Sequence, residues 1–187
     1  MLVMSKQQQA PGELELVRLF VNTADLLDDE EHLPDPPALA AWLCERGIAG
    51  RGLRATPADL RRAVEMREAL REVLIAHTAQ EAVPSAALQT LNSIAERARL
   101  RLRFDEPDCA TLEPQRPGVD GALGRLLAIV HDSIADSTWP RLKACRLEDC
   151  EWAFYDRTKN RCGAWCNMDV CGNRAKARAY RRRRRQS

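Results

Sequence analysis

The chain has 187 residues, of which 45% are hydrophobic and 30% are charged, a composition typical of a globular protein. It contains no run of 18 apolar residues, which argues against a transmembrane helix, and residues 1–12 lack the apolar centre of a secretory signal. We therefore expect a cytosolic protein of bacterial type, in which seven cysteines indicate metal binding or buried thiols rather than disulfides.

Charge and aromatic residues are distributed unevenly along the chain. Residues 138–187 hold 14 basic and 5 acidic side chains, a net charge of +9, whereas residues 1–137 carry a net charge of −7. The last 50 residues also contain six of the nine aromatic residues and five of the seven cysteines. This asymmetry predicts two domains, 1–137 and 138–187, with different partners. The second domain is too short to bury a large core, so we expect its cysteines to stabilise it by a cross-link or a bound metal.

The first domain begins with short apolar segments. Residues 14–23 are expected to form a helix or a strand. An acidic stretch over 25–31 then precedes a proline-rich turn at 34–37. The apolar spacing predicts a second helix from about residue 37 to 46, which ends at Gly47.

A long helix follows. Thr56 is a good N-cap, Pro57 suits the first helical position, and Asp59 places a carboxylate in the first turn. Apolar residues recur at helical spacing from there to about Ala79, and a further helix begins near Pro84.

Alternation of arginine and apolar residues over 99–104 predicts a half-buried strand, with a turn at 105–108 and a hairpin partner at 109–113. Residues 118–121 lead into a last helix whose apolar side includes Ile134. The first domain is thus predicted to be mainly α with a small β-hairpin, an α+β fold.

The cysteines of the second domain form the strongest pattern in the chain. Cys145 and Cys150 are separated by four residues, as are Cys166 and Cys171, and fifteen residues separate the two pairs. Four thiolates at such spacing predict one structural Zn(II) per chain, closed to catalysis. Cys162 is either a free thiol or an alternative to Cys166 as the third ligand.

The second cysteine pair lies at a predicted helix start, where Asn167 is a suitable N-cap. A first pair in a hairpin and a second pair at a helix N-terminus are typical of a treble-clef-like finger, and the positive helix end favours thiolates. We expect Trp152 and Trp165 to cover the metal as a small core rather than to stack on bases.

The final helix is strongly basic. We interpret Asn173 and Arg174, close to the fixed helix start, as the better candidates for specific contacts with nucleic acid, and the run 181–185 as unspecific phosphate binding. A solvated tail is the alternative, and Asn173 could instead bond to the backbone. The candidate contacts are Asn173, Arg174, Lys176, Arg178, Arg181, Arg182 and Arg185.

Nothing in the chain favours catalysis, because no phosphate-binding loop, nucleophile elbow or HExxH motif is present. His77 and His131 are expected to be core histidines and His32 to be exposed. Cys44 and Cys109 are expected to be buried thiols.

The chain also resembles two known families. Residues 145–176 resemble the CGNR zinc finger through Cys145 to Cys150, Trp152 to Arg161, Trp165 to Met168 and the tetrad Cys171-Gly172-Asn173-Arg174. The N-terminal part is similar to ABATE domains of stress-induced bacterial transcription regulators, through Phe20-Val21-Asn22-Thr23 and residues 67–71. The resemblance implies that Cys145, Cys150, Cys166 and Cys171 are the zinc ligands. The chain departs from the finger's usual pattern at Cys162, where serine is common, and at Arg146, where proline is common.

Together these features predict a cytosolic, nucleoid-associated, zinc-dependent transcription regulator. Its second domain would bind double-stranded DNA, while the first would dimerise or sense a signal such as a small-molecule effector. The alternatives are an RNA-binding or ribosome-associated zinc protein and, third, an enzyme with its pocket in the first domain.

Overall fold

The computed structural model describes residues 9–106 and 109–186, without the side chains of residues 105, 106, 109, 185 and 186. Its helices are α1 (Leu14–Val21), α2 (Pro36–Glu45), α3 (Pro57–Ala79), α4 (Ser85–Ala98), α5 (Gly118–Ala135) and α6 (Asn173–Gln186). Three antiparallel strand pairs accompany them: β1 (Ala24–Asp25) with β2 (Glu30–Glu31), β3 (Leu100–Glu106) with β4 (Cys109–Pro114), and β5 (Leu142–Ala144) with β6 (Ala153–Tyr155). A 3₁₀ turn, η2 (Trp139–Arg141), and a π-helical turn, η3 (Met168–Gly172), complete the elements.

Local signals start the helices where the sequence predicts. The Thr56 hydroxyl accepts a hydrogen bond from the Asp59 amide at 3.2 Å, and the Asp59 carboxylate accepts one from the Thr56 amide at 2.8 Å, which completes a capping box. Asp35 caps α2 through the Ala38 amide. The mainly helical fold with a small hairpin is therefore confirmed, and residues 14–21 form a helix rather than a strand.

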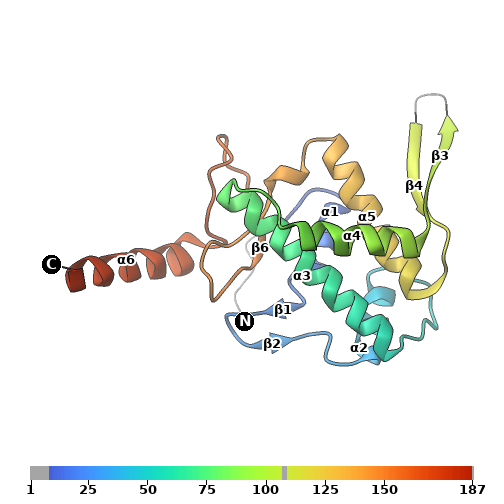
Figure 1. Ribbon diagram of the computed structural model, residues 1–187, viewed down its shortest axis with the longest axis horizontal. Coiled ribbons are helices and arrows are strands. Elements are labelled where there is room, and N and C mark those ends of the chain that lie inside the picture. Colours follow the sequence, from blue (N-terminus) through green and yellow to red (C-terminus); the bar gives the residue numbers. More distant parts are fainter. Residues whose placement is uncertain (1–8, 107–108, 187) are drawn as a thin grey trace.

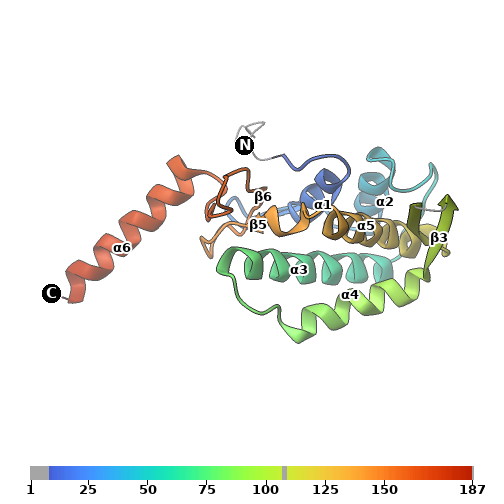
Figure 2. The same ribbon diagram turned by 90° about the horizontal axis from the view of Figure 1, so that it is seen from above.

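Helix α3 lies at the centre of the molecule, with α4 along one side and α1 and α5 along the other (Figures 1 and 2). Large apolar side chains that are inaccessible to solvent fill the core between these helices. Among the most deeply buried are Phe20, Leu39, Leu43, Met66, Leu70, Leu74, Leu123 and Leu126. No helix within residues 9–106 and 109–186 is both long enough and apolar enough to cross a bilayer.

The same core continues past residue 137. Trp139, Leu142, Ala144, Ala153 and Tyr155 are buried in one cluster with the side chains of α1, α3 and α5. Strands β5 and β6 therefore lie against the helices of residues 1–137, here called the first part. Residues on both sides of position 137 share one hydrophobic core.

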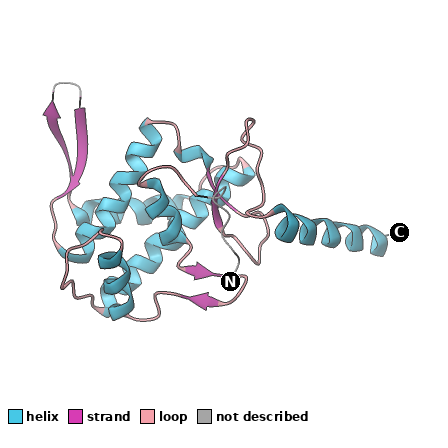
Figure 3. Cartoon of the chain, turned by 180° about the vertical axis from the view of Figure 1, so that it is seen from behind, coloured by secondary structure: helices cyan, strands magenta, loops and turns pink. Residues whose placement is uncertain are grey.

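The β3–β4 hairpin departs from expectation. Leu102 pairs with Leu112 and Phe104 with Ala110, so one face of the hairpin is apolar. Yet Leu102 is 49% exposed and Phe104 is 69% exposed, because the hairpin extends beyond the helices (Figures 1 and 3). The predicted strand and hairpin are therefore confirmed, but the expectation that the strand is half-buried was wrong. The assignment of Ile134 to the apolar side of α5 was also wrong, since that side chain is exposed.

Candidate metal centre and basic helix

Four cysteine sulfurs converge at the junction between strands β5–β6 and helix α6. Their Sγ atoms lie within 4.8 Å of one another, with separations of 3.6 Å for Cys150–Cys166, 3.6 Å for Cys166–Cys171 and 3.7 Å for Cys150–Cys171. A tetrahedron with Zn–S bonds of about 2.3 Å has edges of about 3.8 Å. The thiols of Cys145, Cys150, Cys166 and Cys171 therefore fit one structural Zn(II).

Backbone turns position these thiols. Cys145 follows β5, and its amide donates to the Trp152 carbonyl at 3.0 Å, which closes the turn that carries Cys150. Asn167 is the predicted N-cap, because its Oδ1 accepts from the amides of Asp169 and Val170. The turn after this cap is π-helical, and it carries Cys171 into the cluster. This arrangement confirms the predicted treble-clef-like finger ending in a helix.

The cluster is shielded from solvent. Cys145, Cys150 and Cys171 are buried, and Trp152 and Trp165 pack against them as a small separate core. Interactions among the neighbouring thiols lower the pKa of Cys145 and raise the pKa values of Cys150 and Cys166. The crowded thiols thus cannot all ionise by themselves, and a divalent cation is what allows four thiolates to coexist.

The other cysteines lie apart from this site. Cys162 is exposed, and its amide donates to the Thr158 hydroxyl at 3.1 Å, so the cluster contains Cys166 and not Cys162. Cys44 is half-buried rather than buried, with its thiol 3.1 Å from the Gly50 carbonyl. The Cys109 side chain lies outside the described residues.

Helix α6 projects away from the body of the protein (Figures 1–3). It contains eight basic residues and no acidic one, and none of its described side chains is buried. Exposed among the predicted contacts are Asn173, Arg174, Lys176, Arg178, Arg181 and Arg182, while the Arg185 side chain lies outside the described residues.

The first residues of α6 are tied to the finger. Asn173 Nδ2 donates to the Asp169 carbonyl at 3.0 Å, so this amide caps the preceding turn. Gly172 leaves space for the Met168 sulfur, which a Cβ would displace. Arg178 pairs with Asp149 in the turn between Cys145 and Cys150, and its hydrogen bond lowers the pKa of Asp149. The helix is therefore fixed at its start, while its last two turns extend beyond these contacts.

Side chains of the first part hold strand β6 from the other side. Asn22 Nδ2 donates to the Ala153 carbonyl at 2.9 Å, and the Ala153 amide donates to Asn22 Oδ1 at 2.7 Å. The side-chain amide of Asn22 therefore pairs with β6 as the backbone of a neighbouring strand would. The guanidinium of Arg71 donates to the carbonyls of Val21 and Glu151 at 2.8 and 3.2 Å. Both residues lie in the segments that resemble ABATE domains, but the sequence did not indicate their partners.

Helix α3 also holds strand β5. Thr78 donates to the Ala144 carbonyl at 2.6 Å, and the His77 Nδ1 proton is donated to the Leu142 carbonyl at 2.9 Å. The His77 ring packs edge-on against Trp139, as expected of a core histidine. His131 was wrongly expected in the core, since it is exposed beside Asp132.

This position of His77 predicts a pH dependence of stability. Burial, with the nearby charge of Lys143, lowers its pKa below the ordinary value of 6.5, so the unfolded chain binds more protons below that pH. We expect the free energy of unfolding to fall as the pH drops from 6.5 toward the lowered pKa, by at most about 1.4 kcal/mol per pH unit. His77→Asn keeps a donor for Leu142 and does not titrate. Urea titrations at several pH values should show a shallower fall for the variant, and equal slopes would contradict this assignment.

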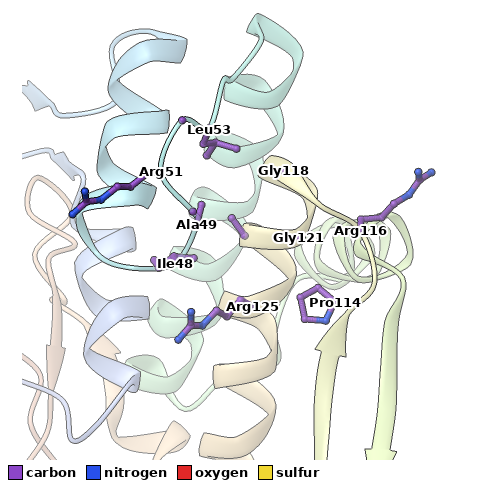
Figure 4. A pocket seen from close by; sticks show the side chains of 12 residues that line it. Ile48, Ala49, Arg51, Leu53, Pro114, Arg116, Gly118, Gly121 and Arg125 are labelled. Atoms are coloured by element: carbon purple, nitrogen blue, oxygen red, sulfur yellow. The ribbon is translucent and has the colours of Figure 1, made fainter.

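A pocket of about 420 Å³ lies between the loop after α2 and the start of α5 (Figure 4). Arg51 and Arg116 point away from one another, and Arg125 is engaged by the Gly47 carbonyl and by Glu13. Among the described residues, neither a histidine nor a carboxylate lines this pocket. It is therefore not the pocket with His77 or His131 beside a carboxylate that the enzyme alternative would need.

Two family models match the chain. Residues 14–137 match ABATE, described as "Putative stress-induced transcription regulator", and residues 141–184 match the CGNR zinc finger. The chain belongs to the ABATE family. Its CGNR finger contains all four clustered cysteines and most of α6. No curated protein matches the chain.

Proposed function

We propose that this ABATE-family protein is a zinc-dependent transcription regulator, not an enzyme, and that α6 docks on double-stranded DNA. The observation that carries the proposal is the exposure of α6. An isolated helix of 14 residues is marginal in water, and like charges four residues apart, such as Arg174 and Arg178, destabilise it further. Asp149 already pairs with Arg178, and a bound polyanion would offset the repulsion along the rest of the helix.

The finger gives the helix a defined direction. Zinc would be held by the four thiolates, and Asn167, Asn173 and Arg178 connect the helix start to that site. A helix held in this way can enter the major groove or follow the phosphates. The N-terminal part, in contact with β5 and β6, is proposed to dimerise or to sense a signal in the cytosol, with the protein associated with the nucleoid.

Arg174 and Arg185 provide the test. Arg174→Ala is expected to weaken binding to a duplex by about tenfold, because a contact from the fixed start of a helix costs about 1–3 kcal/mol when removed. Arg185→Ala removes the same charge from the far end and should weaken binding less than about threefold. Anisotropy titrations at constant salt compare the two, and equal losses would indicate polycation binding without a positioned helix.

A structured RNA of equal charge, titrated at the same salt, addresses the second candidate. The proposal expects tighter binding to the duplex DNA. Tighter binding to the RNA would favour an RNA-binding or ribosome-associated role, since a cationic helix does not itself select DNA.

A further inference from the structure

A buried ion pair lies behind an exposed basic turn of the finger. Lys143 Nζ is 2.8 Å from Asp156 Oδ2, and the two side chains are only 5% and 1% exposed. Burial opposes ionisation of Asp156, but hydrogen bonds from Lys143 and Thr158 lower its pKa to about 2. A buried pair of this kind contributes little net stability compared with apolar residues. Its main effect is on the geometry of the neighbouring turn.

The pair fixes both ends of residues 156–163. Asp156 accepts hydrogen bonds from the amides of Thr158 and Gly163, at 2.9 and 2.8 Å. Lys143 donates to the carbonyls of Arg161 and Gly163, at 2.6 and 3.2 Å. A Cβ on Gly163 would lie 2.8 Å from the Asp156 carboxylate, so only glycine fits there without displacement. The turn between these residues is therefore held in one conformation.

The turn presents cations to solvent. Arg157, Lys159 and Arg161 are exposed, and the acidic residue at its base, Asp156, is neutralised by Lys143. Arg161 adopts a left-handed backbone with φ of 52°, which glycine would adopt at lower cost.

A groove of about 760 Å³ separates the turn from the start of the basic helix. One wall contains Asp156, Arg157 and Thr158. The other contains Trp165, Asn167, Met168 and the exposed carboxylate Asp169, at the turn that leads into α6. In Figure 1 the orange-red turn rises beside the beginning of α6. Two cationic elements thus leave the finger on either side of one groove.

We propose that residues 157–161 bind the sugar–phosphate backbone of the nucleic acid that α6 contacts. This inference rests on the proposed function. Lys159 and Arg161 supply charge to phosphates at a second position, away from the helix, and the buried ion pair sets the position of that charge. The chemical class of the ligand is a phosphodiester polyanion.

The test uses the full-length, zinc-loaded protein and a duplex of mixed sequence. Lys159→Ala combined with Arg161→Gly removes two charges, and glycine accepts the left-handed backbone at 161. We expect the affinity to fall by about tenfold or more at 0.1 M salt, and the slope of log K against log[salt] to become shallower by about 1.8. Zinc content should remain at one per chain.

Arg54→Ala combined with Arg61→Ala is the matched control, because both residues are exposed on the N-terminal part and the charge change is equal. The control should leave the salt slope within about 0.3 of the wild type. The inference is overturned if the salt slope of the turn variant is unchanged, or if the control changes the slope equally. Either result leaves the proposal that α6 docks on DNA intact. If the wild-type protein itself shows no salt-dependent duplex binding, the proposed function fails, and the inference fails with it.

Discussion

Replacing Cys171 with serine is expected to abolish zinc binding and to disorder the finger. The hydroxyl of serine is a poor substitute for a thiolate, and three remaining sulfurs leave the tetrahedron open. Metal binding contributes about 10 kcal/mol or more to the folding of comparable zinc fingers. Residues 164–172 have little other support, because their small core consists mainly of the ligands and of Trp152 and Trp165. Metal analysis should give one zinc per wild-type chain and close to none for the variant.

Cys162→Ser is the matched control, since Cys162 is exposed and outside the cluster. It should retain one zinc. Far-UV circular dichroism of Cys171→Ser should show loss of only part of the helix signal, because the core that holds α1 to α5 is separate from the cysteine cluster. Full zinc retention by Cys171→Ser, or loss of zinc from Cys162→Ser, would assign the ligands differently.

The second large effect is expected at Arg71. Its side chain is buried, and it donates to the carbonyls of Val21 and Glu151 while it pairs with Glu68. Arg71→Met leaves these carbonyls without a donor in the interior, and each buried polar group that loses its partner costs about 1–3 kcal/mol. We expect a loss of this size in the free energy of unfolding, measured by urea titration of the zinc-loaded protein.

Arg97→Met tests whether the effect comes from burial. Arg97 also lies on a helix and pairs with a carboxylate, Asp120, but its side chain is 50% exposed. An exposed pair contributes about 0–1 kcal/mol, so this variant should change the stability little. Equal losses for the two variants would show that the contacts of Arg71 with the finger add nothing of their own.

Features that depend on neighbours in the sequence could be predicted. Thr56 with Asp59 starts α3, and Asn167 caps the turn that carries Cys171, because a cap requires only residues within one helical turn. The spacing of the cysteines likewise identified the metal centre, since close pairs are brought together by short turns.

Contacts between distant residues could not be predicted. Asn22 and Ala153 are 131 positions apart, and Arg71 and Glu151 are 80 apart. An arginine in a long helix is usually solvent-exposed, so no local pattern indicates that Arg71 is buried. Conversely, the alternating pattern around Leu102 and Phe104 is typical of a strand with one covered face, but coverage depends on tertiary packing.

The proposed function requires that four thiolates orient the basic helix α6 toward DNA. The most direct measurement is duplex binding by the wild-type protein and by Cys171→Ser at the same salt, since both have identical arginines in α6. We expect the variant to lose most of the affinity for the duplex and most of the discrimination between duplex sequences. Undiminished binding by the zinc-free variant would contradict it, because charge alone would then suffice.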